Sequence, residues 1–280
     1  MKKVFGRTPG LTSDRFHYCP GCTHGIINRL VAEVMDELGI IENTVGVAPV
    51  GCAMLILDYF ACDMQSAPHG RAPAVATGIK RSLPDRVVFT YQGDGDLAAI
   101  GTAEIIHAAA RGENITSLFV NNAIYGMTGG QMAPTTLPGQ KSSTSPRGRR
   151  IEAAGFPIDM PALISALKGS AYVASGSVDC PKNVILAKKA IKKAFQVQLD
   201  GLGFSFVSIL STCPTNWGLT PRDSIKWLQE HMMPYYVMGE LKTPVDPGRI
   251  FAAAESYKAA APSREKSAAP SSEKAGVASA

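Results

Sequence analysis

The stretch that decides the fold is GDGDLAAIGTAEIIHAAARGENITSLFVNNAIYGMTGGQ, residues 93–131. An apolar segment, 87–91, leads into its Gly-Asp-Gly triplet at 93–95, and a second apolar segment, 115–120, leads into an Asn pair at 121–122. The 25 residues between the triplet and the pair are about what one crossover helix between parallel strands needs. The sequence therefore predicts a strand–helix–strand unit whose strands end together at the carboxyl edge of a parallel sheet, where open α/β sheets bind ligands.

The residue types at these two strand ends suit a diphosphate held by a metal ion. An aspartate such as Asp94 and an asparagine amide offer hard oxygen ligands, and Mg²⁺ commonly takes a few of these plus phosphate oxygens. Gly93 and Gly95 let the backbone approach a phosphate, and the helix that follows offers free N–H groups to an anion. A tight turn with a capping aspartate is the alternative for the triplet alone. With the asparagine pair at crossover spacing, the pattern resembles the thiamin diphosphate motif.

The cysteines point to a second inorganic group. Cys19-Pro-Gly-Cys22 is a C-x-x-C motif, and residues 1–15 lack an apolar core of signal-peptide length, so we expect a cytoplasmic protein with reduced thiols. Zinc sites, thiol exchange and iron–sulfur clusters all use this spacing. A polar stretch precedes the motif, which disfavours thioredoxin-like exchange, and the sequence has no second C-x-x-C to close a zinc site.

Five segments carry a resemblance to a known family. They are YCPGCTHGIINRLVAEVMDELGI (18–40), PVGCAMLILDYF (49–60), HGRAPAVATGIKRSLPD (69–85), the block from GDGD to NNAIYGMTGGQMAPTT (93–136) and STCPTNW (211–217). In this order they resemble the β subunit of the 2-oxoacid:ferredoxin oxidoreductases, over most of the chain. The resemblance implies the α/β thiamin diphosphate-binding fold, a mainly parallel sheet with helices on both faces.

The same resemblance implies a [4Fe–4S] cluster next to thiamin diphosphate. The cysteines that match the family's ligands are Cys19, Cys22, Cys52 and Cys213. Cys62 and Cys180 have no counterpart, and we expect them to be ordinary small buried or half-buried residues. This chain has Thr23 where the usual family form has a glycine, and a glycine there would allow a positive φ.

Site residues transfer from the family motif position by position. Asp94 and Asn122 are the predicted Mg²⁺ ligands, together with the backbone carbonyl of Ile124, whereas Asn121 is expected to support the loop. His69 and Arg71 suit recognition of a diphosphate or a carboxylate, although a surface ion pair is an alternative for Arg71. His24 is either a hydrogen-bond partner of cluster or cofactor or a structural histidine. The predicted cofactor-binding residues are His69, Arg71, Gly93, Asp94, Gly95, Asn122, Thr128 and Gly129.

The activity implied by the resemblance is oxidative decarboxylation of a 2-oxoacid to acyl-coenzyme A and CO₂, with electrons passed to ferredoxin. The glutamate that activates thiamin lies on a partner subunit in this family, and Glu104 and Glu113 lie within the predicted crossover. We therefore expect no activating glutamate, and no other catalytic residue of that kind, in this chain. The expected partners are an α subunit with the pyrimidine-binding domain, and γ and ferredoxin-like δ subunits. The CPTNW form favours 2-oxoglutarate or 2-oxoisovalerate over pyruvate. A non-redox thiamin enzyme and a non-catalytic iron–sulfur protein are the alternatives.

Composition and periodicity bound the rest. The 280 residues are 45% hydrophobic, the apolar run at 45–57 is too short to cross a bilayer, and the net charge of +5 is modest. The lysines at 188, 189, 192 and 193 suit a solvated face or the docking of an acidic electron carrier better than nucleic acid. The pattern predicts one domain over 1–256 and a disordered tail at 257–280. Helices are predicted at 23–38, 73–82, 160–168 and 181–199, strands within 43–49, 87–91, 115–120, 171–175 and 204–210, and a covering loop at 126–150.

Overall fold

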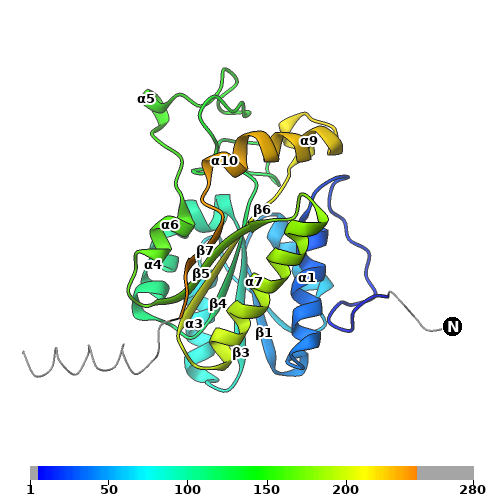
Figure 1. Cartoon of the computed structure of the whole chain (residues 1–280), viewed down its shortest axis with the longest axis vertical. Helices are drawn as coiled ribbons and strands as arrows, with labels where there is room; N and C mark the ends of the chain where they lie inside the picture. Colours follow the sequence, from blue (N-terminus) through cyan, green and yellow to red (C-terminus); the bar gives the residue numbers. More distant parts are fainter. Residues whose placement is uncertain (1–5, 245–280) are drawn as a thin grey trace, which may run out of the picture. The chain divides into compact units, whose positions relative to one another are not determined.

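The computed structural model describes residues 6–244, and within them seven strands form one sheet (Figure 1). The strand order is β2-β1-β3-β4-β6-β5-β7, and every neighbouring pair is parallel except β5 and β7. The strands are β1 Thr44–Ala48, β2 Asp63–Ser66, β3 Val87–Gly93, β4 Thr116–Asn121, β5 Ser170–Ser177, β6 Phe204–Leu210 and β7 Gly239–Lys242. The mainly parallel sheet that the sequence predicts is thus confirmed.

Helices cover both faces of this sheet. One face packs on α1 (His24–Glu37) and α7 (Pro181–Leu199), and the other on α3 (Ala72–Ser82), α4 (Thr102–Arg111) and α6 (Met160–Ser165). The shorter helices are α2 Ile56–Tyr59, α5 Ile151–Ala154, α8 Pro214–Trp217, α9 Pro221–Trp227 and α10 Met233–Tyr235, with turns of 3-10 helix at Ile41–Asn43 and Cys52–Leu55 and of π-helix at Asp96–Ile100 and Leu228–Met232. Because helices cover both faces of the central parallel strands, β3, β4 and β6 are buried along almost their whole length.

A buried amide joins α7 to the sheet. The side chain of Gln198 accepts a hydrogen bond from Val88 N (2.6 Å) and donates to Val88 O (2.9 Å) and to Thr116 Oγ1 (2.8 Å). Ile191 and Phe195 lie on the buried face of this helix, whereas Ile185 is 57% exposed.

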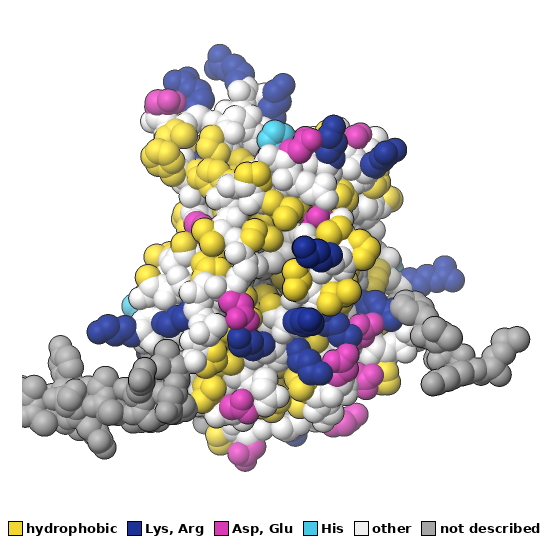
Figure 2. Space-filling view, viewed as in Figure 1, with side chains coloured by type: hydrophobic (Ala, Val, Ile, Leu, Met, Phe, Trp, Pro, Cys, Tyr) yellow, Lys and Arg dark blue, Asp and Glu magenta, His cyan; other side chains and the backbone are white. Residues whose placement is uncertain are grey.

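The lysines of α7 are mostly engaged in ion pairs. Lys188 lies 2.7 Å from carboxylate oxygens of both Glu33 and Glu37 on α1, and Lys192 lies 2.8 Å from Glu37. Lys193 pairs with the carboxylate of β7 residue 240. Figure 2 shows dark blue and magenta side chains intermingled in this region. Three of these lysines are therefore engaged in ion pairs with α1 and β7 and do not form an open basic surface for an acidic carrier.

The topology gathers four loops at one edge. The loops that follow β1, β3, β4 and β6 carry Cys52, Asp94, Asn122 and Cys213, respectively. Since neighbouring parallel strands end at the same edge, residues from across the sequence meet there. No helix within residues 6–244 is long and apolar enough to span a lipid bilayer. The predicted domain end at 256 and the tail at 257–280 lie outside the described residues.

Candidate functional site

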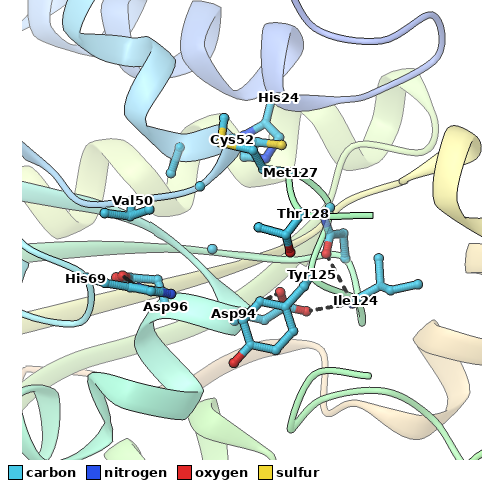
Figure 3. Close-up of a pocket in the computed structure, with 16 residues that line it drawn as sticks. His24, Val50, Cys52, His69, Asp94, Asp96, Ile124, Tyr125, Met127 and Thr128 are labelled. Atoms are coloured by element: carbon cyan, nitrogen blue, oxygen red, sulfur yellow. Dashed lines mark hydrogen bonds and ion pairs between the residues drawn. The ribbon is translucent and has the colours of Figure 1, made fainter. Parts of the chain in front are cut away.

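A pocket opens at this edge of the sheet (Figure 3). It encloses about 120 Å³. Its lining includes the loop after β1, the triplet after β3 and the loop after β4. Residues from both the predicted metal motif and the predicted cysteine set line it: Cys52, His69, Gly93, Asp94, Gly95, Asn122, Ile124 and Thr128, along with His24, Asp96, Tyr125, Gly126 and Met127.

Asp94 is held in a fixed orientation at the floor of this pocket. Its side chain is buried, with 2% of the residue exposed. Its Oδ1 accepts a hydrogen bond from Gly95 N (2.8 Å), and its Oδ2 accepts from Ile124 N (3.2 Å) and Thr135 Oγ1 (2.6 Å). Burial raises the pKa of Asp94 to about 6, against the lowering effect of Thr135 and the neighbouring N–H groups. Buried carboxylates are usually paired with an opposite charge or bound to a metal ion.

The loop after β4 turns sharply to reach Asp94. Ala123 has φ of 56°, the one positive φ at a non-glycine among residues 6–244, and strain of this kind clusters at functional sites. Ile124 N donates to Asn122 Oδ1 at 3.2 Å as well as to Asp94 Oδ2, so the two side chains share this N–H group as donor. Asn121 instead accepts from Ala123 N at 3.0 Å and supports the loop, as predicted.

A glycine is required at position 95 by packing. A Cβ at Gly95 would lie 2.4 Å from the ring of Tyr125, so only glycine lets this ring close over the triplet. Tyr125 and Thr135 are site residues that the sequence reasoning missed. Thr135 lies in the covering loop and Tyr125 directly precedes it. Neither position has a signal of its own, although both fall inside the segment quoted for the family resemblance.

The four predicted cluster cysteines come from three segments and lie beside the loop after β4. A Cβ added at Gly126 would lie 3.4 Å from Cys213 Sγ, 3.5 Å from Cys52 Sγ and 3.5 Å from Asn122 Nδ2. Burial is the main cause that raises the pKa of Cys22 to about 12, and the neighbouring thiols Cys213, Cys52 and Cys19 contribute to the rise.

Two side chains tie the cysteine loops together. Thr23 Oγ1 lies 2.7 Å from Ser211 Oγ and accepts from Thr212 N at 3.2 Å, so it joins the C-x-x-C loop to the loop that carries Cys213. Its φ is −90°, so no glycine is needed where the family form has one. Asn216 Nδ2 donates to Gly126 O at 2.6 Å and contacts Cys213 Sγ at 3.4 Å.

The donor chemistry fits both inorganic groups. Buried carboxylate and amide oxygens suit Mg²⁺, and grouped thiols suit an iron–sulfur cluster. Within residues 6–244, no three His, Cys, Asp or Glu side chains are arranged around a single metal ion. A cluster does not require that arrangement, because its thiolates bind different iron atoms. Cys62 contacts Met64 Sδ at 3.6 Å and Cys180 precedes α7, both away from this group.

Two predicted cofactor residues lie outside the pocket lining. Arg71 pairs with Glu104 at 2.7 Å and donates to Ile100 O at 2.9 Å, which is the surface ion pair given as its alternative. Gly129, with φ of 104°, belongs to a turn next to Thr128. His24 is structural and also lines the pocket: burial lowers its pKa to about 4, and its Nδ1 lies 2.8 Å from Tyr91 Oη.

Comparison with known proteins agrees with this fold. The model of the thiamine pyrophosphate enzyme C-terminal TPP binding domain matches residues 50–209, so the chain contains a domain of the class that binds thiamine pyrophosphate, or thiamin diphosphate. Ketoisovalerate oxidoreductase subunit VorA of Methanothermobacter thermautotrophicus is 49% identical over 83% of this chain and 49% of that protein. The 2-oxoglutarate synthase subunit KorB of Methanocaldococcus jannaschii is 39% identical over 76% of this chain and 77% of that protein.

A solved structure extends the likeness to three dimensions. The 2-oxoglutarate:ferredoxin oxidoreductase from Magnetococcus marinus, with 2-oxoglutarate, coenzyme A and succinyl-CoA bound, matches with a TM-score of 0.71 and 25% identity, over 91% of each chain. The chain belongs to the β subunits of the 2-oxoacid:ferredoxin oxidoreductases. It spans about half the length of VorA and most of KorB.

Proposed function

We propose that this chain is the thiamin diphosphate-binding subunit of an enzyme that oxidatively decarboxylates a 2-oxoacid to acyl-coenzyme A and CO₂ and passes the electrons to ferredoxin. One observation carries the proposal. The space next to Gly126 is bordered by Asn122, from the loop after β4, and by the sulfurs of Cys52 and Cys213. A diphosphate site alone would serve many thiamin enzymes, but cysteines packed against it could hold an iron–sulfur cluster, which would supply an electron acceptor within reach of the reaction.

On this proposal Asp94 and Asn122 bind Mg²⁺ through side-chain oxygens and Ile124 through its carbonyl. The residues that approach the diphosphate are Gly93, Gly95 and Thr128. Thiamin diphosphate, when bound, supplies the electron sink for decarboxylation. The chain's own contribution is to fix the carboxylate orientation through Thr135 and the Gly95 and Ile124 N–H groups, and to cover the site with Tyr125.

The four cysteines Cys19, Cys22, Cys52 and Cys213 are the proposed ligands of a [4Fe–4S] cluster. Burial raises the pKa of Cys52 to about 11 and that of Cys213 in the same direction, so these thiols stay protonated near neutral pH until iron replaces the protons. A cluster held there would take electrons from the pocket and hand them to a ferredoxin-like subunit or to ferredoxin.

The chain supplies part of the enzyme. An α subunit with the pyrimidine-binding domain, and γ and δ subunits, are the proposed partners. The names of its relatives support 2-oxoisovalerate or 2-oxoglutarate as the substrate. The cytoplasmic location expected from the sequence stays a prediction. The VorA relative is the more similar of the two, which favours the branched-chain 2-oxoacid.

The experiment is to purify the chain anaerobically with its partner subunits and to assay a panel of 2-oxoacids with coenzyme A and a dye acceptor. We expect coenzyme A-dependent dye reduction, bound thiamin diphosphate, and iron and acid-labile sulfide in the full chain. An iron-free complex that releases an aldehyde without reducing the dye would contradict the proposal and identify a non-redox thiamin enzyme.

A further inference from the structure

One wall of the pocket is not explained by the metal, diphosphate and cluster contacts. His69 lies on this wall with a side chain that is 37% exposed, and its Nδ1 hydrogen-bonds to Oδ1 of Asp96, whose side chain is 1% exposed. In Figure 3, His69 and Asp96 lie on one side of Asp94, whereas Ile124 and Thr128 lie on the other. This pair therefore lies across Asp94 from the loop after β4.

The hydrogen bonds of Asp96 define where the His69 proton lies. Its Oδ1 also accepts from Gly70 N at 2.6 Å, and its Oδ2 accepts from Gln92 Nε2 at 2.7 Å. A carboxylate accepts hydrogen bonds from all of its partners, so His69 Nδ1 must carry a hydrogen. Neutral imidazole has one N–H, and Nε2 then has a lone pair.

The backbone around the pair is rigid. Asp96 begins a π-helical turn, Asp96–Ile100, a feature frequent at functional sites. A Cβ on Gly70 would lie 2.7 Å from Gly101 N, and one on Gly101 would lie 2.8 Å from Gly70 O. The two glycines let the turn that carries His69 pack directly on the π-turn that carries Asp96.

We propose that Asp96 is a positioning residue for the reaction: it holds His69 with its proton on Nδ1, so that Nε2 faces the pocket as an acceptor of a substrate proton. The inference rests on the proposed function. In this form His69 cannot donate to a diphosphate oxygen, which was one of its expected roles, but it can accept from a hydroxyl or a thiol. In the transfer, the substrate O–H or S–H bond breaks, its electron pair stays on oxygen or sulfur, and the proton joins Nε2.

The first test reads the tautomer without activity. The full chain, labelled with ¹⁵N-histidine, is studied by NMR at about pH 8, above the ordinary histidine pKa, and His69→Gln identifies the His69 signals. We expect the Nδ1–H tautomer in the wild type and in Asp96→Asn, because the amide oxygen can still accept from Nδ1. Asp96→Ala should lose this preference. A wild-type spectrum with the proton on Nε2 overturns the proposal.

The second test uses the assembled enzyme. Asp96→Asn replaces the anionic acceptor of the His69 Nδ1 hydrogen bond by a neutral amide, so we expect kcat to fall at least about tenfold while KM for the 2-oxoacid and the Kd of thiamin diphosphate stay within about twofold. Asp179→Asn is the matched control, since Asp179 also accepts from several side chains, Ser177, Asn183 and Gln229, and lies outside the pocket lining. Its kcat should equal that of the wild type.

Half-reactions separate the two proton sources. The rate of cluster reduction by the 2-oxoacid without coenzyme A tests a substrate hydroxyl as the proton donor, and the rate of acyl transfer to coenzyme A tests a thiol. A slower rate of either half-reaction in Asp96→Asn supports the proposal. Unchanged rates in both, or a raised KM at unchanged kcat, contradict it. A wild-type complex that oxidises no 2-oxoacid would refute the proposed function instead, and the NMR spectrum would then decide the positioning of His69 by itself.

Discussion

At the scale of single residues, the site depends on a carboxylate whose charge is disfavoured by its surroundings. Burial raises the pKa of Asp94 from 3.8 to about 6. A group with a raised folded-state pKa stabilises the fold through its bound proton, and that stabilisation is present at low pH and is lost as the pH rises through about 6. A bound cation has the opposite preference, because it binds the ionised form. On the proposed function, Mg²⁺ binding and proton binding would therefore compete at Asp94.

We expect Mg²⁺-dependent binding of thiamin diphosphate to weaken about tenfold between pH 7 and pH 5, as Asp94 becomes protonated. Asp94→Asn should lower the affinity at least about a hundredfold near neutral pH and should remove this pH dependence, while the iron content remains. Calorimetric titration of the full chain across this pH range measures both effects. Equal affinities of variant and wild type would place the metal elsewhere.

At the scale of elements, the site is made by how strands end. β3 and β4 are regular and buried, and the chemistry begins at the residue after each, where Asp94 and Asn122 leave the sheet. The turn after β4 then doubles back through the left-handed conformation of Ala123. The geometry of this turn brings Ile124 N within hydrogen-bond distance of both side chains.

Substitutions of Ala123 test the turn. Ala123→Gly should keep cofactor binding and change the free energy of unfolding by no more than about 1 kcal/mol, because relief of strain and loss of chain stiffness offset each other. Ala123→Val should cost about 2 kcal/mol or more and weaken cofactor binding, since a β-branched residue resists positive φ and the site is fully buried. Urea unfolding and cofactor titration check this; a valine variant with wild-type affinity would show that the turn is not needed.

Elements with strong periodicity could be predicted from the sequence, and contacts made by single side chains could not. The helix at Pro181–Leu199 and the strand at Phe204–Leu210 lie where the pattern placed them. The strand at Asp63–Ser66 and the edge strand at Gly239–Lys242 were missed, because both are short, polar edge strands without alternation. Asp96 was seen only as the start of a helix, since nothing in the spacing reveals its contact with His69.

At the scale of the whole molecule, the proposed cluster ligands join segments that are distant in sequence. Replacing Cys19, Cys22, Cys52 or Cys213 by Ser should each reduce iron and sulfide content and dye-linked oxidation, because a hydroxyl is a far weaker iron ligand than a thiolate. Iron and acid-labile sulfide per chain, measured in anaerobically purified complexes, give the readout.

The remaining two cysteines are the matched controls. Cys62→Ser and Cys180→Ser should leave the iron content near that of the wild type, since both residues lie away from the other four. Equal losses at all six positions would indicate misfolding, and full iron content in the Cys213 variant would remove that residue from the ligand set.

Two truncations test where the domain ends. Residues 258–280 contain one Val and no Leu, Ile, Met or aromatic residue, so a chain ending at Tyr257 should unfold within about 2 °C of the full chain and should assemble with its partners. A chain ending at Met238 loses β7 and with it the contacts of Glu240 to Tyr172 and Lys193, and should unfold several degrees lower. If the chain that ends at Tyr257 failed to assemble, residues 258–280 would be identified as a docking element.

The distance along the chain between the C-x-x-C loop and the loop after β6 has a consequence for biosynthesis. A ribosome adds roughly 5–20 residues per second, so on the proposed ligand set the first three thiols wait on the order of ten seconds or more for Cys213 to be made. Each new molecule therefore passes through an iron-free stage, and the cellular donor of iron and sulfide must act on a nearly complete domain. A cell deprived of iron should accumulate full-length subunit that lacks its inorganic core.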